Sequence, residues 1–174
     1  MQARHQPLSV LISSTYSFTI CFAIWMIFAV LGVPLKTLLH LNDTQFGLLA
    51  AMPVLSGALV RVPLGILTDR FGGRIVFFCL MLFCVPFLFV MSYATAFWHF
   101  LVLGLCLGLV GGSFSVGTPY VARWFPAHRR GFAMGVFGAG NSGAALTKFV
   151  APALIAAFGW QMLPKIYAAA LLVT

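Results

Sequence analysis

Long apolar runs separated by short polar loops make up nearly the whole chain. Five runs are long enough to cross the hydrocarbon core of a bilayer, which takes about 20 helical residues. A sixth has gone about nine residues where the sequence stops at Thr174, so we expect a fragment that ends within a helix. The predicted membrane-spanning segments are about residues 10–31, 46–67, 75–91, 97–122 and 131–157, with an incomplete sixth at 166–174. This pattern predicts one all-α, polytopic transmembrane helix bundle over residues 1–174.

The composition supports a lipid environment. The chain is 62% hydrophobic and 7% charged, whereas a soluble domain carries about 25% charged residues. Its net charge of +8 would suggest nucleic acid in a soluble protein, but most basic residues lie in loops between apolar runs, so we expect no nucleic-acid partner. The four cysteines lie inside apolar runs without a C-x-x-C pair. We therefore predict no metal site and no cofactor.

The basic residues of the loops predict the orientation in the membrane. Cytoplasmic loops carry an excess of Lys and Arg. One set of loops holds six such residues and the other set holds two: Arg4, Arg70, Arg74, Arg123, Arg129 and Arg130 against Lys36 and Lys165. We therefore expect a multi-pass protein of the cell inner (cytoplasmic) membrane with its amino terminus in the cytoplasm.

Two cationic side chains and one amide lie inside predicted spans. Arg61 is about nine residues from Arg70, hence roughly 13 Å from the cytoplasmic edge and near the midplane. A charged residue there marks an ion or substrate path by default. Asn141 also lies near the midplane, and Lys148 follows two turns later on the same face. The alternatives for Arg61 are a structural arginine bonded to carbonyls or one that reaches outward to the membrane surface. Asn141 is alternatively an asparagine that joins helices, and Lys148 a lysine that reaches the membrane surface or pairs with the missing part of the protein.

The surroundings of Arg61 suit a planar anion. Its guanidinium offers a planar fork of donors that matches an oxyanion. Gly57 and Gly65 lie one turn to either side on the same face, so we expect them to leave space around the guanidinium.

The loop "GILTDRFGGR" resembles the conserved loop of the major facilitator superfamily, roughly G-x-L-x-D-R-x-G-R-K. The matching positions are Gly65, Leu67, Asp69, Arg70, Gly72 and Arg74, whereas Gly73 replaces an expected basic residue. The resemblance implies two six-helix bundles with substrate held between them. This chain would be the N-terminal bundle, and the C-terminal half would be its missing partner. We expect Asp69 to act in a cytoplasmic gate, capping backbone N–H groups or pairing with an arginine. The alternative is an ordinary basic loop with a glycine turn.

The stretch "GAGNSGAALTKFVAP" contains G-x-G-N-x-G and resembles the signature of the nitrate/nitrite porter family. Arg61 in "SGALVRVP", the "FGGR" loop and "WFP" are similar to that family as well. The resemblance implies that the helix-two arginine and the signature helix hold the anion beside an aromatic ring, with the glycines allowing close backbone approach. The implied substrate-binding residues are Arg61, Phe114, Gly138, Gly140, Asn141 and Gly143, to which we add Lys148 as a further cation. Helix packing is the alternative for the glycines, and core or lipid contact is the alternative for Phe114.

The resemblance implies a secondary active transporter of nitrate, nitrite or both, working by alternating access. Nitrate/nitrite antiport and proton-coupled nitrate symport both remain open, so protons are an open second partner beside the anion and the lipid bilayer. We expect no enzyme, because the chain shows neither a nucleophile–base pair nor a phosphate loop. The alternatives are a major facilitator carrier for another small anion, a non-transporting membrane protein, or an inactive fragment.

Overall fold

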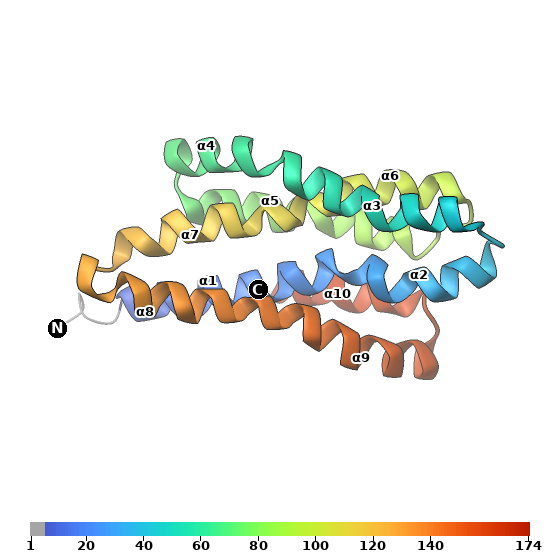
Figure 1. Cartoon of the computed structure of the whole chain (residues 1–174). Helices are drawn as coiled ribbons and strands as arrows, with labels where there is room; N and C mark the ends of the chain where they lie inside the picture. The colour runs from blue at the N-terminus through green and yellow to red at the C-terminus, as the bar shows by residue number, and fades with distance from the viewer. Residues whose placement is uncertain (1–5) are drawn as a thin grey trace.

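The computed structural model describes residues 6–174, and within this range the chain forms helices and no strands (Figure 1). This confirms the all-α prediction. Five continuous helical segments are long and apolar enough to cross a membrane: Pro7–Leu38, Asp43–Phe71, Gly73–Met91, Phe97–Trp124 and Ala127–Phe158. A shorter apolar helix, α10 (Met162–Val173), follows them. Arg4, which entered the count of loop charges, lies outside the described residues.

Most of the long segments are divided into shorter helices. The first comprises α1 (Gln6–Trp25) and α2 (Ile27–Leu38), the second α3 (Asp43–Leu59) and α4 (Arg61–Phe71), and the third α5 (Gly73–Met91) alone. The fourth runs through α6 (Phe97–Gly108), the 3₁₀ turn η2 (Leu109–Gly112) and α7 (Ser113–Trp124). The fifth runs through α8 (Ala127–Gly138), η3 (Ala139–Ser142) and α9 (Gly143–Phe158). These helices extend beyond the predicted apolar spans, because helical hydrogen bonding continues where the side chains become polar.

The break between α3 and α4 has a local cause. Pro63 has no N–H group, so the carbonyl of Leu59 lacks the donor that would continue the helix. Accordingly α3 ends at Leu59 and α4 begins at Arg61, and the chain bends at this point (Figure 1). Arg61 therefore occupies the first turn after a helix break.

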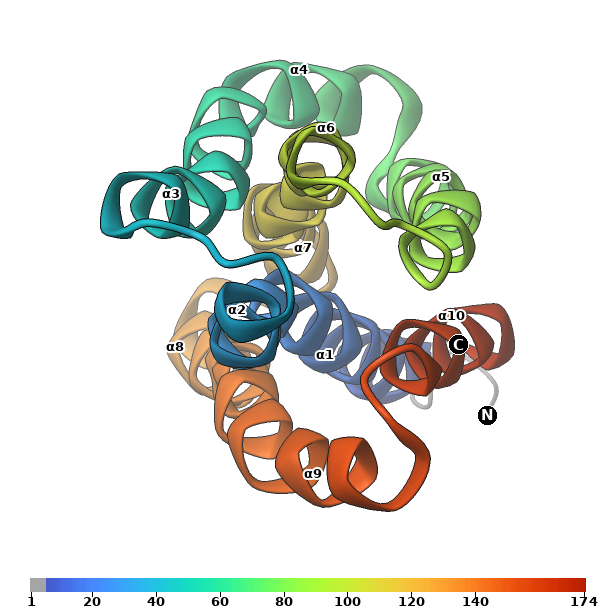
Figure 2. The same cartoon turned by 90° about the vertical axis from the view of Figure 1, so that its right-hand side faces the viewer.

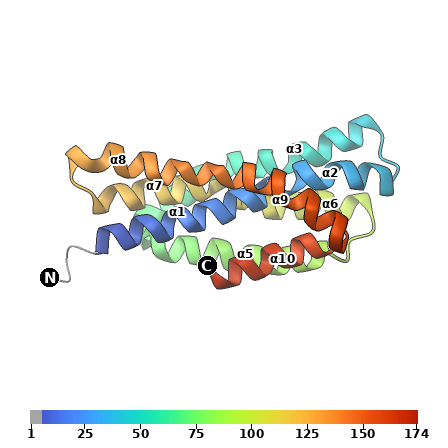
Figure 3. The same ribbon diagram turned by 90° about the horizontal axis from the view of Figure 1, so that it is seen from below.

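Seen along the bundle, α5 and α10 lie together on one side, α3 and α8 lie on the other, and α4 and α9 cross at the top and the bottom of the view (Figure 2). Between them, α1 packs against α7, η3 and α9, and α4 packs against α7. The view from below shows α8–α9 running along the length of α1 and α2 (Figure 3). The helix from α8 to α9 carries the stretch from Gly138 to Pro152, and we call it the signature helix. Thus α1 is the central helix onto which the signature helix is packed.

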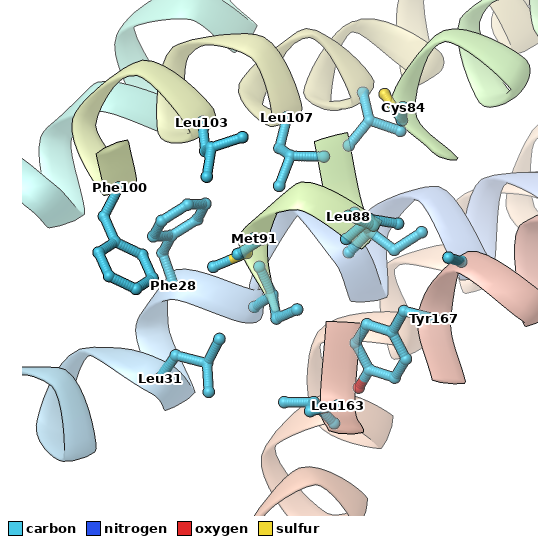
Figure 4. Packing of buried hydrophobic residues seen from close by; sticks show 14 of the residues in the cluster. Phe28, Leu31, Cys84, Leu88, Met91, Phe100, Leu103, Leu107, Leu163 and Tyr167 are labelled. Atoms are coloured by element: carbon cyan, nitrogen blue, oxygen red, sulfur yellow. The ribbon is translucent and has the colours of Figure 1, made fainter. Parts of the chain in front are cut away.

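The main hydrophobic core lies toward the α2 end of the bundle. Side chains from α2, α5, α6 and α10 meet around Leu88 and Met91, both with no exposed surface (Figure 4). The outer surface is apolar as well, since side chains such as Phe149 and Val33 are 82% and 67% exposed. A protein that is apolar both inside and outside fits a bilayer, and the helices support a multi-pass membrane protein.

Candidate functional site

Arg61 is exposed, and within residues 6–174 its guanidinium has no hydrogen-bond or ion-pair partner. The structure therefore does not support the alternative of an arginine bonded to helix carbonyls. The chain contains only two acidic side chains, and both are engaged elsewhere. Asp43 Oδ1 lies 2.7 Å from Lys36 Nζ, and Asp69 Oδ1 lies 2.7 Å from the Arg123 guanidinium. No carboxylate side chain of this chain is left to neutralise Arg61.

The two glycines beside Arg61 have different surroundings. A Cβ atom at Gly65 would meet nothing within 4 Å, so the space expected there is present. At Gly57 the expectation of open space is wrong, because a Cβ would lie 3.0 Å from Trp25 Nε1 and 2.9 Å from the Gly108 carbonyl oxygen. Trp25 Nε1 also donates a hydrogen bond of 3.0 Å to the Pro53 carbonyl. Gly57 thus lets α3 pack closely on α1 and α6, one turn before Arg61.

Phe114 belongs to a group of aromatic rings built on α1. Its ring is 44% exposed, and its centroid lies 5.6 Å from that of Phe18 and 5.9 Å from that of Phe137. Phe18, Phe22 and Trp25 follow one another along one face of α1, with centroid distances of 5.6 Å and 5.2 Å. We call these three residues the aromatic row. It leads from Phe114 to Trp25, which contacts Gly57 one turn from Arg61.

The aromatic row is not part of the sequence prediction. Its signal is the helical spacing of Phe18, Phe22 and Trp25 in "FTICFAIW". Such spacing is typical of any buried helix face, so it carried no functional meaning before Phe114 and Gly57 were placed beside it.

The structure assigns Gly140 and Gly143 to helix packing. A Cβ at Gly140 would overlap the Phe18 ring, and a Cβ at Gly143 would overlap the Thr19 carbonyl oxygen. Both glycines are buried against α1. Helix packing, the alternative for these glycines, is therefore present, because α1 fills the space where a side chain would lie, and their place beside the anion stays a prediction. Gly138 differs, since a Cβ there would meet nothing within 4 Å.

A polar contact also joins the signature helix to α1, one turn beyond Gly143. Thr147 is fully buried, and its hydroxyl donates to the Ala23 carbonyl at 2.9 Å. The Tyr167 hydroxyl donates in turn to Thr147 Oγ1 at 3.0 Å. Small residues and interhelical hydrogen bonds are the usual means by which membrane helices associate. Gly140, Gly143 and Thr147, which we call the packing seam, therefore fix the signature helix to α1.

Asn141 and Lys148 are both exposed, but their neighbours differ. Asn141 Nδ2 donates to the Gly138 carbonyl at 2.8 Å, so this bond stays within its own helix instead of joining two helices. An amide nitrogen carries two N–H groups, so one donor remains. Lys148 lines a groove between α2 and α9. The structure thus brings Phe114 and the signature helix together around Phe18, and it places Lys148 apart in a groove of its own.

The predicted gating loop joins the ends of α4, α5 and α7. Asp69 forms an ion pair with Arg123, and pairing with an arginine is one of its two expected roles. The pair lies at the surface, since the two side chains are 67% and 55% exposed. Gly72 has a φ of +86°, a conformation that favours glycine and lets the chain turn into α5. A Cβ at Gly73 would overlap Tyr120 of α7, which explains why a small residue replaces the basic one.

The remaining two residues of the loop make looser contacts. The Arg70 guanidinium lies 5.9 Å from the centroid of the Phe71 ring. Arg74 lines a groove with Tyr120 and serines of α1.

Comparison with known families decides the fold family. The sequence profile described as Major Facilitator Superfamily matches residues 14–174. The chain belongs to the major facilitator superfamily. Its helical bundle and its loop from Gly65 to Arg74 agree with this membership.

Individual relatives show which members of the superfamily the chain is similar to. The chain is 42% identical over 177 residues to a probable nitrate/nitrite antiporter, NarK1, of Thermus thermophilus, covering 95% of this chain and 40% of that protein. It is 36% identical to a nitrite extrusion protein of Bacillus subtilis (84% and 37% covered) and 33% identical to a probable nitrate transporter, NarT, of Staphylococcus carnosus (88% and 39% covered). The chain thus spans about two fifths of the length of these relatives. The resemblance to nitrate/nitrite porters is confirmed.

Proposed function

We propose that this chain forms the N-terminal bundle of a secondary active transporter that moves nitrate or nitrite across the membrane by alternating access. The observation that carries the proposal is Arg61, whose charge no carboxylate side chain of this chain neutralises. A charged side chain within a membrane helix is costly unless it is paired or hydrated. A mobile anion supplies the missing charge, and the names of the relatives support nitrate or nitrite as that anion.

The neighbours of Arg61 suit a small planar oxyanion. A guanidinium binds two oxygen atoms of such an ion through parallel N–H groups, which a lysine ammonium does not do. The aromatic row and Phe114 give a flat apolar border on α1 and α7. Asn141 retains one amide N–H for the anion, and Gly138 leaves room beside it. In this proposal a second bundle, the C-terminal half, closes the other side of the site.

The Asp69–Arg123 pair serves as the gate in this proposal. It joins the ends of α4 and α7. An exposed ion pair contributes only about 0–1 kcal/mol to stability, so it breaks and reforms readily as the bundles rock. The end of the bundle that carries it also holds Arg70, Arg74, Arg129 and Arg130. This excess of arginine supports a cytoplasmic location of that end in the inner membrane, and with it a cytoplasmic amino terminus.

Anion counterflow in proteoliposomes tests the proposed function. The protein expressed from its own gene is reconstituted, the vesicles are loaded with nitrite, and saturable nitrate uptake is measured. We expect uptake that competing nitrite inhibits and acetate does not. If nitrate uptake depends on internal nitrite, the protein is an antiporter. If a proton gradient drives nitrate uptake into empty vesicles, it is a symporter. Uptake of a carboxylate without nitrate would assign another anion carrier, and no saturable anion uptake would contradict the proposal.

A further inference from the structure

Lys148 lies in a groove of about 460 Å³ between α2 and α9. Apart from Lys148 the groove is lined by apolar residues of the two helices: Ala29, Val30, Val33, Pro34, Pro152, Ile155 and Ala156. Within the described part of the chain the Lys148 ammonium has no hydrogen-bond or ion-pair partner. The groove therefore combines one cation with walls that offer it no opposite charge.

Each of the two prolines of the groove removes one hydrogen bond from its helix. Proline has no N–H group, so the carbonyl four residues earlier receives no helical hydrogen bond. In α2, Pro34 leaves the carbonyl of Val30 without its donor, and in α9, Pro152 does the same for Lys148. Both pairs of residues line the groove. Two carbonyls on the walls of the groove therefore lack the helical hydrogen bond that their neighbours have.

The groove and Arg61 lie at different depths. Counting 1.5 Å per residue, Arg61 is about 15 Å from the end of α4 at Phe71. Lys148 is about 15 Å from the opposite end of the bundle, where α9 ends at Phe158. Asn141 lies between them along the bundle, about 10 Å before Lys148 on its helix. The three polar side chains are therefore spaced along the long axis of the bundle.

We propose that the Lys148 groove is a second, transient binding station for the transported oxyanion, placed between Arg61 and the end of the bundle opposite the gating loop. This proposal rests on the proposed function. Its occupant is a nitrate-like anion because the groove's one charged group is an unneutralised cation and both carboxylate side chains of the chain are engaged elsewhere. Occupation of a first station raises the local anion concentration, so it lowers the KM for anion entering from that side.

Nitrate uptake by Lys148→Gln tests the station, again with the protein expressed from its own gene in proteoliposomes. We expect the KM for nitrate added on the side of this groove to rise about tenfold, as for the loss of one charged hydrogen bond, with kcat nearly unchanged. Lys148→Arg keeps the charge and should keep a low KM. Lys165→Gln is the matched control, because its ammonium sits 4.8 Å from the centroid of the Tyr93 ring, outside the groove.

The outcomes separate this proposal from the one on which it rests. Without nitrate uptake by the wild-type protein, both proposals fail. With wild-type uptake present, an unchanged KM in Lys148→Gln would overturn the station alone. An equal rise of KM in Lys165→Gln would also overturn it, since general surface charge would then be the cause. A changed pH profile with an unchanged KM would assign Lys148 to proton transfer instead.

Discussion

At Arg61 and Lys148 the chain places positive charge on apolar helices and provides no acid for either. The count of two acidic residues is visible in the sequence, and so is an arginine as one expected partner of Asp69, but which arginine is not. Asp69 and Arg123 are 54 positions apart, and no local pattern links them. The prediction that Arg61 faces a path for ions follows from its position alone, whereas its lack of a partner required the structure.

Single glycines of the signature helix differ in role. We predict that Gly143→Ala lowers the stability of the protein by about 1–3 kcal/mol, because the added methyl overlaps the Thr19 carbonyl of α1. Gly138→Ala is the matched control in the same stretch, where open space leaves only a small gain in helix propensity. Thermal unfolding midpoints in detergent measure both. Equal midpoints for the two variants would contradict the packing seam.

At the scale of helices, α1 organises the candidate site. Its surface carries the aromatic row toward Phe114 and also receives the packing seam of the signature helix, the two meeting where Gly140 packs on Phe18. The sequence predicted helices in the right places, because apolar length determines a span. It did not predict which side of a glycine-rich helix faces a neighbour, since periodicity gives a face but not the partner of that face. The packing of Gly140 and Gly143 on α1 therefore required the structure.

The Asp69–Arg123 ion pair between α4 and α7 leads to a second prediction. Asp69→Arg places two arginines together at the loop, so we expect it to slow nitrate uptake strongly. Exchanging both residues, Asp69→Arg with Arg123→Asp, restores the pair and should recover most of the uptake. The same exchange at Lys36 and Asp43, an equally short pair at the opposite end, should leave uptake close to wild type. A double exchange as inactive as Asp69→Arg would show that the pair itself is not what transport requires.

For the whole molecule, the sequence predicted the membrane bundle and the family because both depend on patterns along the chain. Loop motifs and span lengths are such patterns. The sites depend on how helices rotate and tilt against each other, which patterns along the chain do not determine. The break that brings Arg61 to the start of α4 follows from Pro63, yet the contact of Trp25 with Gly57 could not be foreseen. The chain spans about two fifths of the length of its relatives, and in the proposed function a second bundle completes the site.

The most direct test of the account is the rate of nitrate uptake by Arg61→Lys, compared with the wild-type protein in the same proteoliposomes. Lysine keeps the charge but loses the planar fork of donors. We predict that kcat/KM for nitrate falls by about tenfold or more, as expected when a charged hydrogen bond is lost, while thermal stability stays unchanged because Arg61 has no partner within residues 6–174. Wild-type kinetics in Arg61→Lys would contradict the central claim that this guanidinium recognises a planar oxyanion.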